Sequence, residues 1–167
     1  MRVGGIFTVK HIRNGNCIGK YRFHNDVTDV GLRDIINTMF RSGSTPALPY
    51  EDWYMGLIDN AAFTGLDNSD IMSSHTGWAE FEDYSEGVRQ TWTAVLLSNP
   101  ATFINTAACV FTIDAAGDIE GMFISSDSVV GALGVSGFLW ATASFDAAIS
   151  VLIGDAFRVQ YQLTASR

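Results

Sequence analysis

Alternating apolar and polar residues mark the first part of the chain as a β-hairpin. Residues 3–10 show the period of two that is typical of a half-buried strand. An Asn-Gly-Asn sequence follows at 14–16, and these residues accept the positive φ angles of a tight turn at little steric cost. Residues 17–23 return as the second strand. We therefore expect a hairpin over residues 1–24.

A different spacing follows and predicts one helix over residues 28–41. Thr28 or Asp29 is suited to cap its first turn, because their side-chain oxygens accept hydrogen bonds from free backbone N–H groups. The apolar residues recur at i, i+3, i+4, i+7 and i+8, which places them on one helical face. These residues are Leu32, Ile35, Ile36, Met39 and Phe40. We expect this face to pack across an end or a face of the β-structure.

Short apolar runs separated by turn residues predict a β-rich body over residues 52–166. Residues 59–90 are rich in Asp, Ser, Gly and aromatics without clear periodicity, which indicates a long ordered loop or several short pieces. A turn at 115–118 is expected to join two strands as a hairpin. The expected strands are Trp53–Ile58, Thr91–Leu97, Phe103–Ile113, Ile119–Ser125, Phe138–Phe145 and 157–164.

The last of these strands has the clearest alternation. Phe157, Val159 and Tyr161 face one way, and Arg158 and Gln160 face the other. Seven or eight short strands with one helix predict a mainly β fold, a jelly-roll-like β-sandwich or barrel with an N-terminal hairpin. A chain of 167 residues has the usual size of one domain, so we expect residues 1–167 to form a single domain.

The charges are divided unevenly along the chain, and this division bears on possible partners. The formal net charge is −8, yet seven of the ten Lys and Arg residues lie in the first 41 positions. A strongly acidic body repels phosphate backbones, so nucleic acid is not expected as a partner. The basic hairpin is expected either to be solvated or to dock on an acidic neighbour, including another copy. The residues for such contacts are Arg2, Lys10, Arg13, Lys20 and Arg22.

Four carboxylates within seven residues, Glu80, Glu82, Asp83 and Glu86, predict a solvated acidic edge. This edge is also a candidate docking surface for Lys or Arg of a neighbour. A paired-carboxylate glycosidase site is the alternative, although such enzymes usually place their two carboxylates on separate elements.

Oxygen-bearing side chains at Asp59, Asp67, Asn68 and Asp70 are candidate ligands for Ca²⁺. Their spacing is not that of an EF-hand loop. Acids in a loop rich in turns more often cap those turns and face water, and we regard that as the competing interpretation.

No motif in the sequence is typical of a catalytic centre. The histidines are not paired at metal-ligand spacing, and phosphate-binding loops and nucleophile elbows are absent from the sequence. A Ser–His–Asp group can be drawn from Ser73, His75 and Asp70, but a triad is defined by its geometry in space. We instead expect His75 to hydrogen-bond locally and to hold the 59–90 loop beside Trp78. We expect neither enzymatic activity nor a cofactor.

Cysteine usage and hydropathy bear on the compartment. Cys17 and Cys109 are far apart and fit no zinc spacing. The first residues contain no apolar segment of the length that a secretory signal needs. Residues 128–145 carry no charge, but their glycines and small polar residues predict a loop and a buried strand instead of a membrane span. We expect assembly in a reducing cytoplasm and no membrane partner.

Aromatic residues are concentrated between 53 and 92. Rings of this kind serve as platforms for sugars, but a long loop with few aliphatic residues also needs large anchors, and each buried aromatic removes about 150–250 Å² from water. We therefore expect them to be packed. They are Trp53, Tyr54, Trp78, Phe81, Tyr84 and Trp92.

Two stretches, W-Y-M-G-L-I-D at 53–59 and M-S-S-H-T-G-W at 72–78, belong to a motif that resembles a family of tailed-bacteriophage virion proteins. The resemblance also includes the hairpin, the helix that follows Asn25 and the closing strand after Gly154-Asp155, so it covers nearly the whole chain. Its motif is structural and marks no active site. The motif positions are Trp53, Tyr54, Gly56, His75, Gly77, Trp78, Tyr84, Arg89 and Trp92.

The resemblance implies a role in the virion, on the surface of the head, as a cement or decoration protein with a jelly-roll-like fold. Such a protein binds the major capsid protein and adds contacts across the joints between its subunits. We expect a homo-oligomer. The alternative is a tail, collar or fibre-associated component that contacts the host or another tail protein.

Overall fold

The computed structural model describes residues 2–40, 52–97, 102–131 and 137–166, and this part of the chain is mainly β with one helix. In chain order the elements are β1 Arg2–Arg13, β2 Asn16–His24, β3 Asp26–Val27, α1 Asp29–Phe40, β4 Tyr54–Asp59, β5 Ala79–Phe81, β6 Gln90–Thr91, β7 Ala94–Leu97, β8 Thr102–Asn105, β9 Cys109–Thr112, β10 Gly117–Ser125, β11 Leu139–Val151 and β12 Ala156–Ser166.

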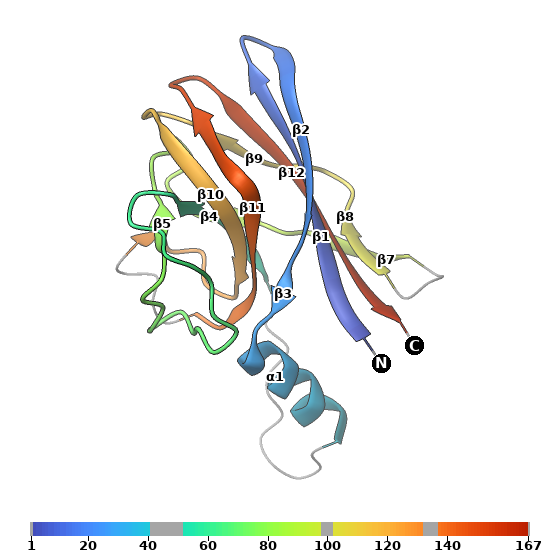
Figure 1. The fold of residues 1–167 in the computed structure, drawn as a ribbon. Helices are drawn as coiled ribbons and strands as arrows, with labels where there is room; N and C mark the ends of the chain where they lie inside the picture. Colours follow the sequence, from blue (N-terminus) through green and yellow to red (C-terminus); the bar gives the residue numbers. More distant parts are fainter. Residues whose placement is uncertain (1, 41–51, 98–101, 132–136, 167) are drawn as a thin grey trace.

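These strands form two antiparallel sheets that lie face to face as a β-sandwich (Figure 1). The first sheet has the order β2-β1-β12-β8-β7, and β9 also pairs with β12. The second sheet has the order β3-β11-β10-β4-β5, and β6 also pairs with β4. The mainly β fold class is therefore confirmed, and the jelly-roll variant of it stays a prediction.

The main hydrophobic core lies between the two sheets and takes side chains from both. Phe7, Phe157 and Tyr161 of the first sheet and Leu57 and Met122 of the second are fully buried in it. The predicted alternation in the last strand is confirmed, because its apolar residues face the core and Arg158 is exposed. Burial of this apolar area is the main free-energy term that holds the two sheets together.

The N-terminal hairpin is confirmed, with β1 and β2 joined at Asn14 and Gly15. Both residues have positive φ, 50° and 78°, as the tight turn requires. Strand β1 is also paired with β12 along its length, from Arg2 opposite Ser166 to Ile12 opposite Ala156. The hairpin is thus continuous with the first sheet.

The helix is confirmed at one end of the sandwich (Figure 1). Thr28 caps it, because its Oγ1 accepts a hydrogen bond from Gly31 N at 3.2 Å and donates to Leu139 O at 2.7 Å. Ile35 packs against the main core. The expected packing of the whole apolar face is wrong for Leu32 and Ile36, which are exposed. The side chains of Met39 and Phe40 lie outside the described residues.

Two predicted strands are each divided in the structure, at 91–97 by a change of sheet and at 103–113 by a break within the first sheet, and the predicted hairpin at 115–118 is wrong. The segment 91–97 contains the end of β6 in the second sheet and β7 in the first, and 103–113 contains β8 and β9 as separate strands. The turn at 115–118 connects β9 to β10 in the opposite sheet, so it closes no hairpin. Both sheets require apolar residues, and the sequence pattern therefore does not mark a crossing between them.

The described residues of the predicted segment 128–145, which are 128–131 and 137–145, hold loop structure and the first part of β11, as expected. Among the residues that the structure describes, no helix is long and apolar enough to cross a membrane.

Asp155, which directly precedes β12, connects this strand to the turn end of the N-terminal hairpin. Its carboxylate is buried and accepts hydrogen bonds from Nε and Nη2 of Arg13 at 2.8 and 2.6 Å. It also lies 2.7 Å from Nε2 of His11 and accepts the backbone N–H of Leu152 at 2.9 Å. The expectation that Arg13 is available to a neighbour is therefore wrong, because its charge is already paired within the chain.

The hydrogen bonds from Arg13 hold the pKa of Asp155 well below its usual range, against the opposing effect of burial, and Leu152 N–H and His11 add to the lowering. Because the folded-state pKa lies below the unfolded value of about 3.9, this carboxylate stabilises the fold above that pH. Its contribution is lost as the pH falls from about 4 through the folded-state pKa.

We expect Asp155→Asn to lower the free energy of unfolding at pH 7 by about 2 kcal/mol, because the donors on His11, Arg13 and Leu152 lose a buried, charged acceptor. The variant should also lose less stability than the wild type between about pH 4 and pH 2. Urea unfolding at a series of pH values measures both effects. Asp83→Asn, which changes an exposed carboxylate, is the control. An unchanged acid-side slope in Asp155→Asn would contradict the assignment.

Candidate functional site

Residues 60–78, which we call the covering loop, lie on the outer face of the second sheet and give that face a small core of its own. Met72 and Trp78 of the loop are buried against Ile58, Phe123 and Leu139 of the sheet. Figure 1 shows the loop beside β10 and β11, on the side away from the first sheet. The prediction of an ordered loop with short pieces is confirmed, since it includes a bridge between residues 71 and 74 and leads into β5.

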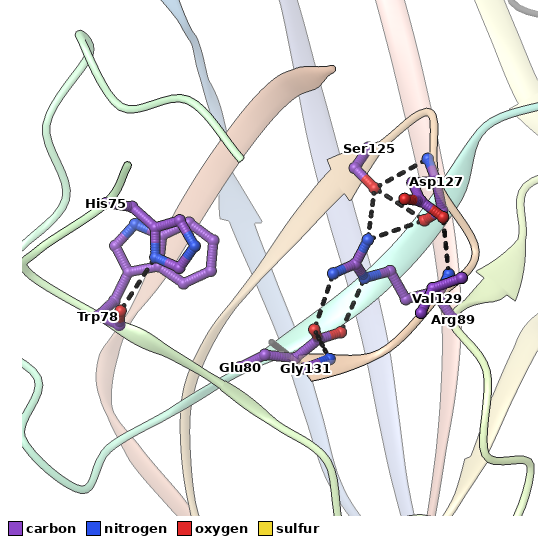
Figure 2. A network of polar contacts seen from close by, with 8 residues as sticks. All are labelled: His75, Trp78, Glu80, Arg89, Ser125, Asp127, Val129 and Gly131. Carbon is purple, nitrogen blue, oxygen red and sulfur yellow. Dashed lines mark hydrogen bonds and ion pairs between the residues drawn. The ribbon is translucent and has the colours of Figure 1, made fainter. Parts of the chain in front are cut away.

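Trp78 is the centre of this small core. The His75 ring stacks on it with centroids 3.8 Å apart and an angle of 18°, and His75 Nδ1 lies 3.1 Å from Trp78 O. Trp78 Nε1 donates to Asp70 Oδ2 at 2.9 Å, and Phe123 packs on the ring from the sheet side. Figure 2 shows the stacked rings of His75 and Trp78. The prediction that His75 bonds locally and holds the loop beside Trp78 is confirmed.

Two glycines of the motif are required by close approach of neighbouring groups. A Cβ at Gly77 would collide with the carbonyl oxygen of Gly65, and the carbonyl oxygen of Gly77 accepts a hydrogen bond from Thr64 N–H at 2.8 Å. A Cβ at Gly56 would collide with the ring of Phe123. These positions let the covering loop lie close against itself and let β4 lie close to β10.

Arg89 is the most extensively bonded side chain near the loop, and Figure 2 shows its contacts. Its side chain is 1% exposed, and its Nε and Nη2 donate to Oε1 and Oε2 of Glu80 at 2.9 and 2.8 Å. Its Nη1 donates to Ser125 Oγ at 3.1 Å and to Asp127 O at 2.9 Å. Glu80 Oε2 also accepts Gly131 N at 2.9 Å. One guanidinium therefore joins the motif segment, the end of β10 and the loop after it.

The energetics of this contact are those of a buried ion pair. Removing each ion from water costs several kcal/mol, and only good geometry with further hydrogen bonds offsets that cost. The bidentate arrangement of Arg89 and Glu80 provides the good geometry, and the hydroxyl and carbonyl partners of Arg89 provide the further hydrogen bonds. Arg89 Cζ also lies 5.0 Å from the centroid of the Phe123 ring, a favourable cation–π distance. The charge of Arg89 is thus fully used inside the fold.

A pocket of about 190 Å³ opens beside this ion pair. Its lining residues are Met72, His75, Trp78, Ala79, Glu80, Glu82, Arg89 and Gly131. Two of the charges in its wall, those of Glu80 and Arg89, are paired with each other, and both oxygens of Glu80 accept hydrogen bonds. This arrangement stabilises the loop and leaves Glu80 poorly placed to serve as the acid or base of a glycosidase.

The four carboxylates at 80–86 have different environments, so the prediction of one solvated acidic edge is wrong in part. The side chain of Glu80 is 6% exposed and paired with Arg89. Glu86 is half-buried, and both of its oxygens accept the N–H of Thr112. Glu82 and Asp83 are exposed and remain candidates for contacts with a neighbour.

The candidate calcium ligands do not come together. Asp59 and Asp67 each accept a backbone N–H two residues further on, from Ala61 and Ser69, as acids in turns commonly do. Asp70 is occupied by the indole N–H described above. Among the residues that the structure describes, no three side chains of His, Cys, Asp or Glu gather as a metal ion requires.

Tyr54 is partly buried and belongs to neither apolar cluster. The other remaining aromatics of the motif face the main core or its margin, where Tyr84 is buried and Trp53 is partly buried. Trp92 packs edge-on against Tyr161 and donates its Nε1–H to the carbonyl oxygen of that residue at 3.2 Å. The prediction that these aromatics anchor the fold is confirmed at Trp53, Tyr84 and Trp92.

The basic residues of the hairpin have two different roles. Arg13 is paired inside the fold, whereas Lys10, Lys20 and Arg22 are exposed on the first sheet. Arg2 begins β1, but its side chain lies outside the described residues. Arg158 was not among the residues predicted to contact a neighbour, although the alternation of apolar and polar residues along β12 placed it on the solvent side.

The partnership of Glu80 and Arg89 was also missed, although one signal was available. Arg89 is the single Lys or Arg between residues 42 and 157. Glu80 alternates with the core residue Phe81, which turns it toward the covering loop. A carboxylate that is placed under a loop requires a cation, and the sequence offers one nearby.

Comparison of the sequence with protein-family models returned no match, and comparison with curated proteins returned none. The interpretation of the site therefore depends on its geometry and on the resemblance of its motif.

We expect Glu80→Gln and Arg89→Met each to lower the free energy of unfolding by about 3–5 kcal/mol, because each leaves a buried partner uncompensated. The double variant Glu80→Gln/Arg89→Met should lose clearly less than the sum of the two single losses. Urea unfolding measures all three. Glu82→Gln, an exposed neighbour, should change stability by less than about 0.5 kcal/mol. Additive losses would mean that the two side chains are not coupled.

Proposed function

We propose that this chain is a structural component of a tailed-bacteriophage virion, a cement or decoration protein on the surface of the head. In this role it reinforces contacts between subunits of the major capsid protein, as a non-enzymatic, oligomeric jelly-roll protein without a cofactor. The resemblance of the 53–92 motif supports the virion assignment. The observation that carries the proposed mode of action is an exposed apolar edge on the first sheet.

Strand β7 forms this edge, and it is unusually apolar for its exposure. Val95, Leu96 and Leu97 are 41%, 60% and 45% exposed. Within the described strands β7 pairs with β8 alone, so its second edge offers backbone N–H and C=O groups to an incoming strand. Natural proteins usually protect such an edge with Lys, Pro or a covering segment, and residues 94–97 contain neither Lys nor Pro.

Apolar side chains continue inward from this edge. Leu96 lies opposite Phe103, which lies opposite Leu163, so the three form a row across β7, β8 and β12. With Trp53 and Trp92, Phe103 and Leu163 line a hollow of about 290 Å³. Figure 1 shows β7 and β8 at one edge of the first sheet, away from β10 and β11 of the second sheet. An apolar surface that the second sheet does not cover is therefore open to a partner.

A strand or loop of a capsid subunit fits such a surface through two contributions. Its backbone adds to the edge of β7, and its side chains enter the hollow. Burial of one large apolar side chain contributes about 1.5–3 kcal/mol, which is modest for one copy. In a particle with many such joints, the small free energies of the individual contacts add up to a large stabilisation, as a cement protein requires.

The test uses capsids that lack this chain and the purified protein added back to them. We expect the wild-type chain to co-sediment with the capsids and to raise the temperature at which they break open. Leu96→Glu should weaken co-sedimentation at least about 10-fold, since it removes an apolar contact and places a charge at the joint. Ile153→Glu is the matched control, because Ile153 is 73% exposed in the β11–β12 turn, away from β7.

Two outcomes would overturn the proposal. Capsids without the chain that survive heat and low salt as well as complete ones would exclude a cementing role. Labelled antibody that binds at the tail and not at the head would instead support the alternative, a tail, collar or fibre-associated protein. Equal binding of Leu96→Glu and the wild type would exclude the β7 edge as the contact.

A further inference from the structure

Exposed basic side chains form a continuous row on the outer face of the first sheet. Lys10 lies directly opposite Lys20 on β2 and directly opposite Arg158 on β12. Residues opposite each other in antiparallel strands point to the same face, and neighbouring strands lie about 4.8 Å apart, so three cations occupy about 10 Å. Arg22 is exposed on the same face, opposite Thr8.

This row is unfavourable for the isolated chain. Like charges directly opposite each other destabilise a sheet. The described strands of the first sheet contain no Asp or Glu that would neutralise the row. The ion pairs found among the described residues involve other cations, namely His11, Arg13 and Arg89. The row therefore presents unneutralised positive charge on one flat face.

The second sheet has the opposite character. Its described strands contain no Lys or Arg. The covering loop protects one part of its outer face, and acidic side chains occupy the part beyond it. Asp118 and Asp146 are exposed there, and Glu120 is half-buried on β10. These residues alternate with core residues such as Ile119, which places them on the outer face.

We propose that the outer face of the first sheet docks on the acidic outer face of the second sheet of another copy of this chain. The contact joins two different surfaces, so it is heterologous and leaves one unused face on each end of a pair. It therefore builds rings or short stacks. This contact needs no capsid and goes beyond the proposed role in the virion.

Charge complementarity favours a second copy over a polyanion such as nucleic acid. The net charge of −8 repels a phosphate backbone as a whole. The same net charge also acts between two copies, but at 0.1 M salt the Debye length of about 10 Å limits that repulsion to nearby groups. The closest groups in the proposed contact are the basic row and the acidic face, which attract each other.

The test measures self-association of the purified full chain by sedimentation at about 50 mM and about 500 mM salt. We expect concentration-dependent association at low salt that weakens at high salt. Lys10→Glu/Lys20→Glu/Arg158→Glu should lower the association constant at least about 100-fold, because three attractive contacts become repulsive. Asp118→Lys/Glu120→Lys/Asp146→Lys should have the same effect from the other side. Arg33→Glu, an exposed helix position outside the row, is the matched control and should leave association unchanged.

A mixture of the two triple variants provides the decisive comparison. Neither associates with itself, but the acidic first sheet of one variant is complementary to the basic second sheet of the other, so the mixture should form hetero-oligomers. Circular dichroism of each variant verifies that the sheets are intact. A wild-type chain that stays monomeric at low salt, or a mixture that fails to associate, would overturn the proposal. Binding of the wild type to DNA that depends on the basic row would also overturn it.

Discussion

The buried ion pair between Glu80 and Arg89 is the interaction on which the outer half of the structure depends. It joins β5 to the segment before β6 and reaches the backbone beyond β10 through Asp127 O and Gly131 N, beside a pocket that the covering loop also lines. Nothing in local sequence preference requires residues 60–78 to lie flat on a sheet. The loop is held by burial of Met72 and Trp78 against the sheet, and the pair of Glu80 and Arg89 is removed from water beside it.

The two sheets differ in their outer faces because the covering loop lies on the second sheet alone. The second sheet is buried on both faces where the loop covers it, and its strands are correspondingly apolar, as in β4 and the second half of β10. The first sheet has no such cover, and its outer face and its β7 edge meet solvent. The surfaces that we propose for partners therefore lie on the first sheet and on the uncovered acidic part of the second, while the aromatic motif acts as scaffold.

Much of the fold was predictable from the sequence where burial has a regular period. The hairpin, the helix and β12 each repeat one pattern against one surface, and periodicity identifies them. The crossings between sheets near Trp92 and at residues 113–116 were not predictable in this way, because an apolar run has the same pattern in either sheet. The acids at 80–86 look alike in sequence, yet Glu80 is buried and Glu82 exposed, since the difference depends on a loop that folds over one of them.

Hydrogen exchange of the backbone amides tests the central claim, that the covering loop is a fixed part of the sandwich. The relevant amides are those of Thr64, Ile71 and Ser74, which donate to carbonyl oxygens within the loop. The account predicts that they exchange slowly, through openings of at least about 3 kcal/mol, together with the amides of β4 and β10. Exchange of the loop amides at the rate of an unprotected chain, while β4 and β10 stay protected, would contradict it.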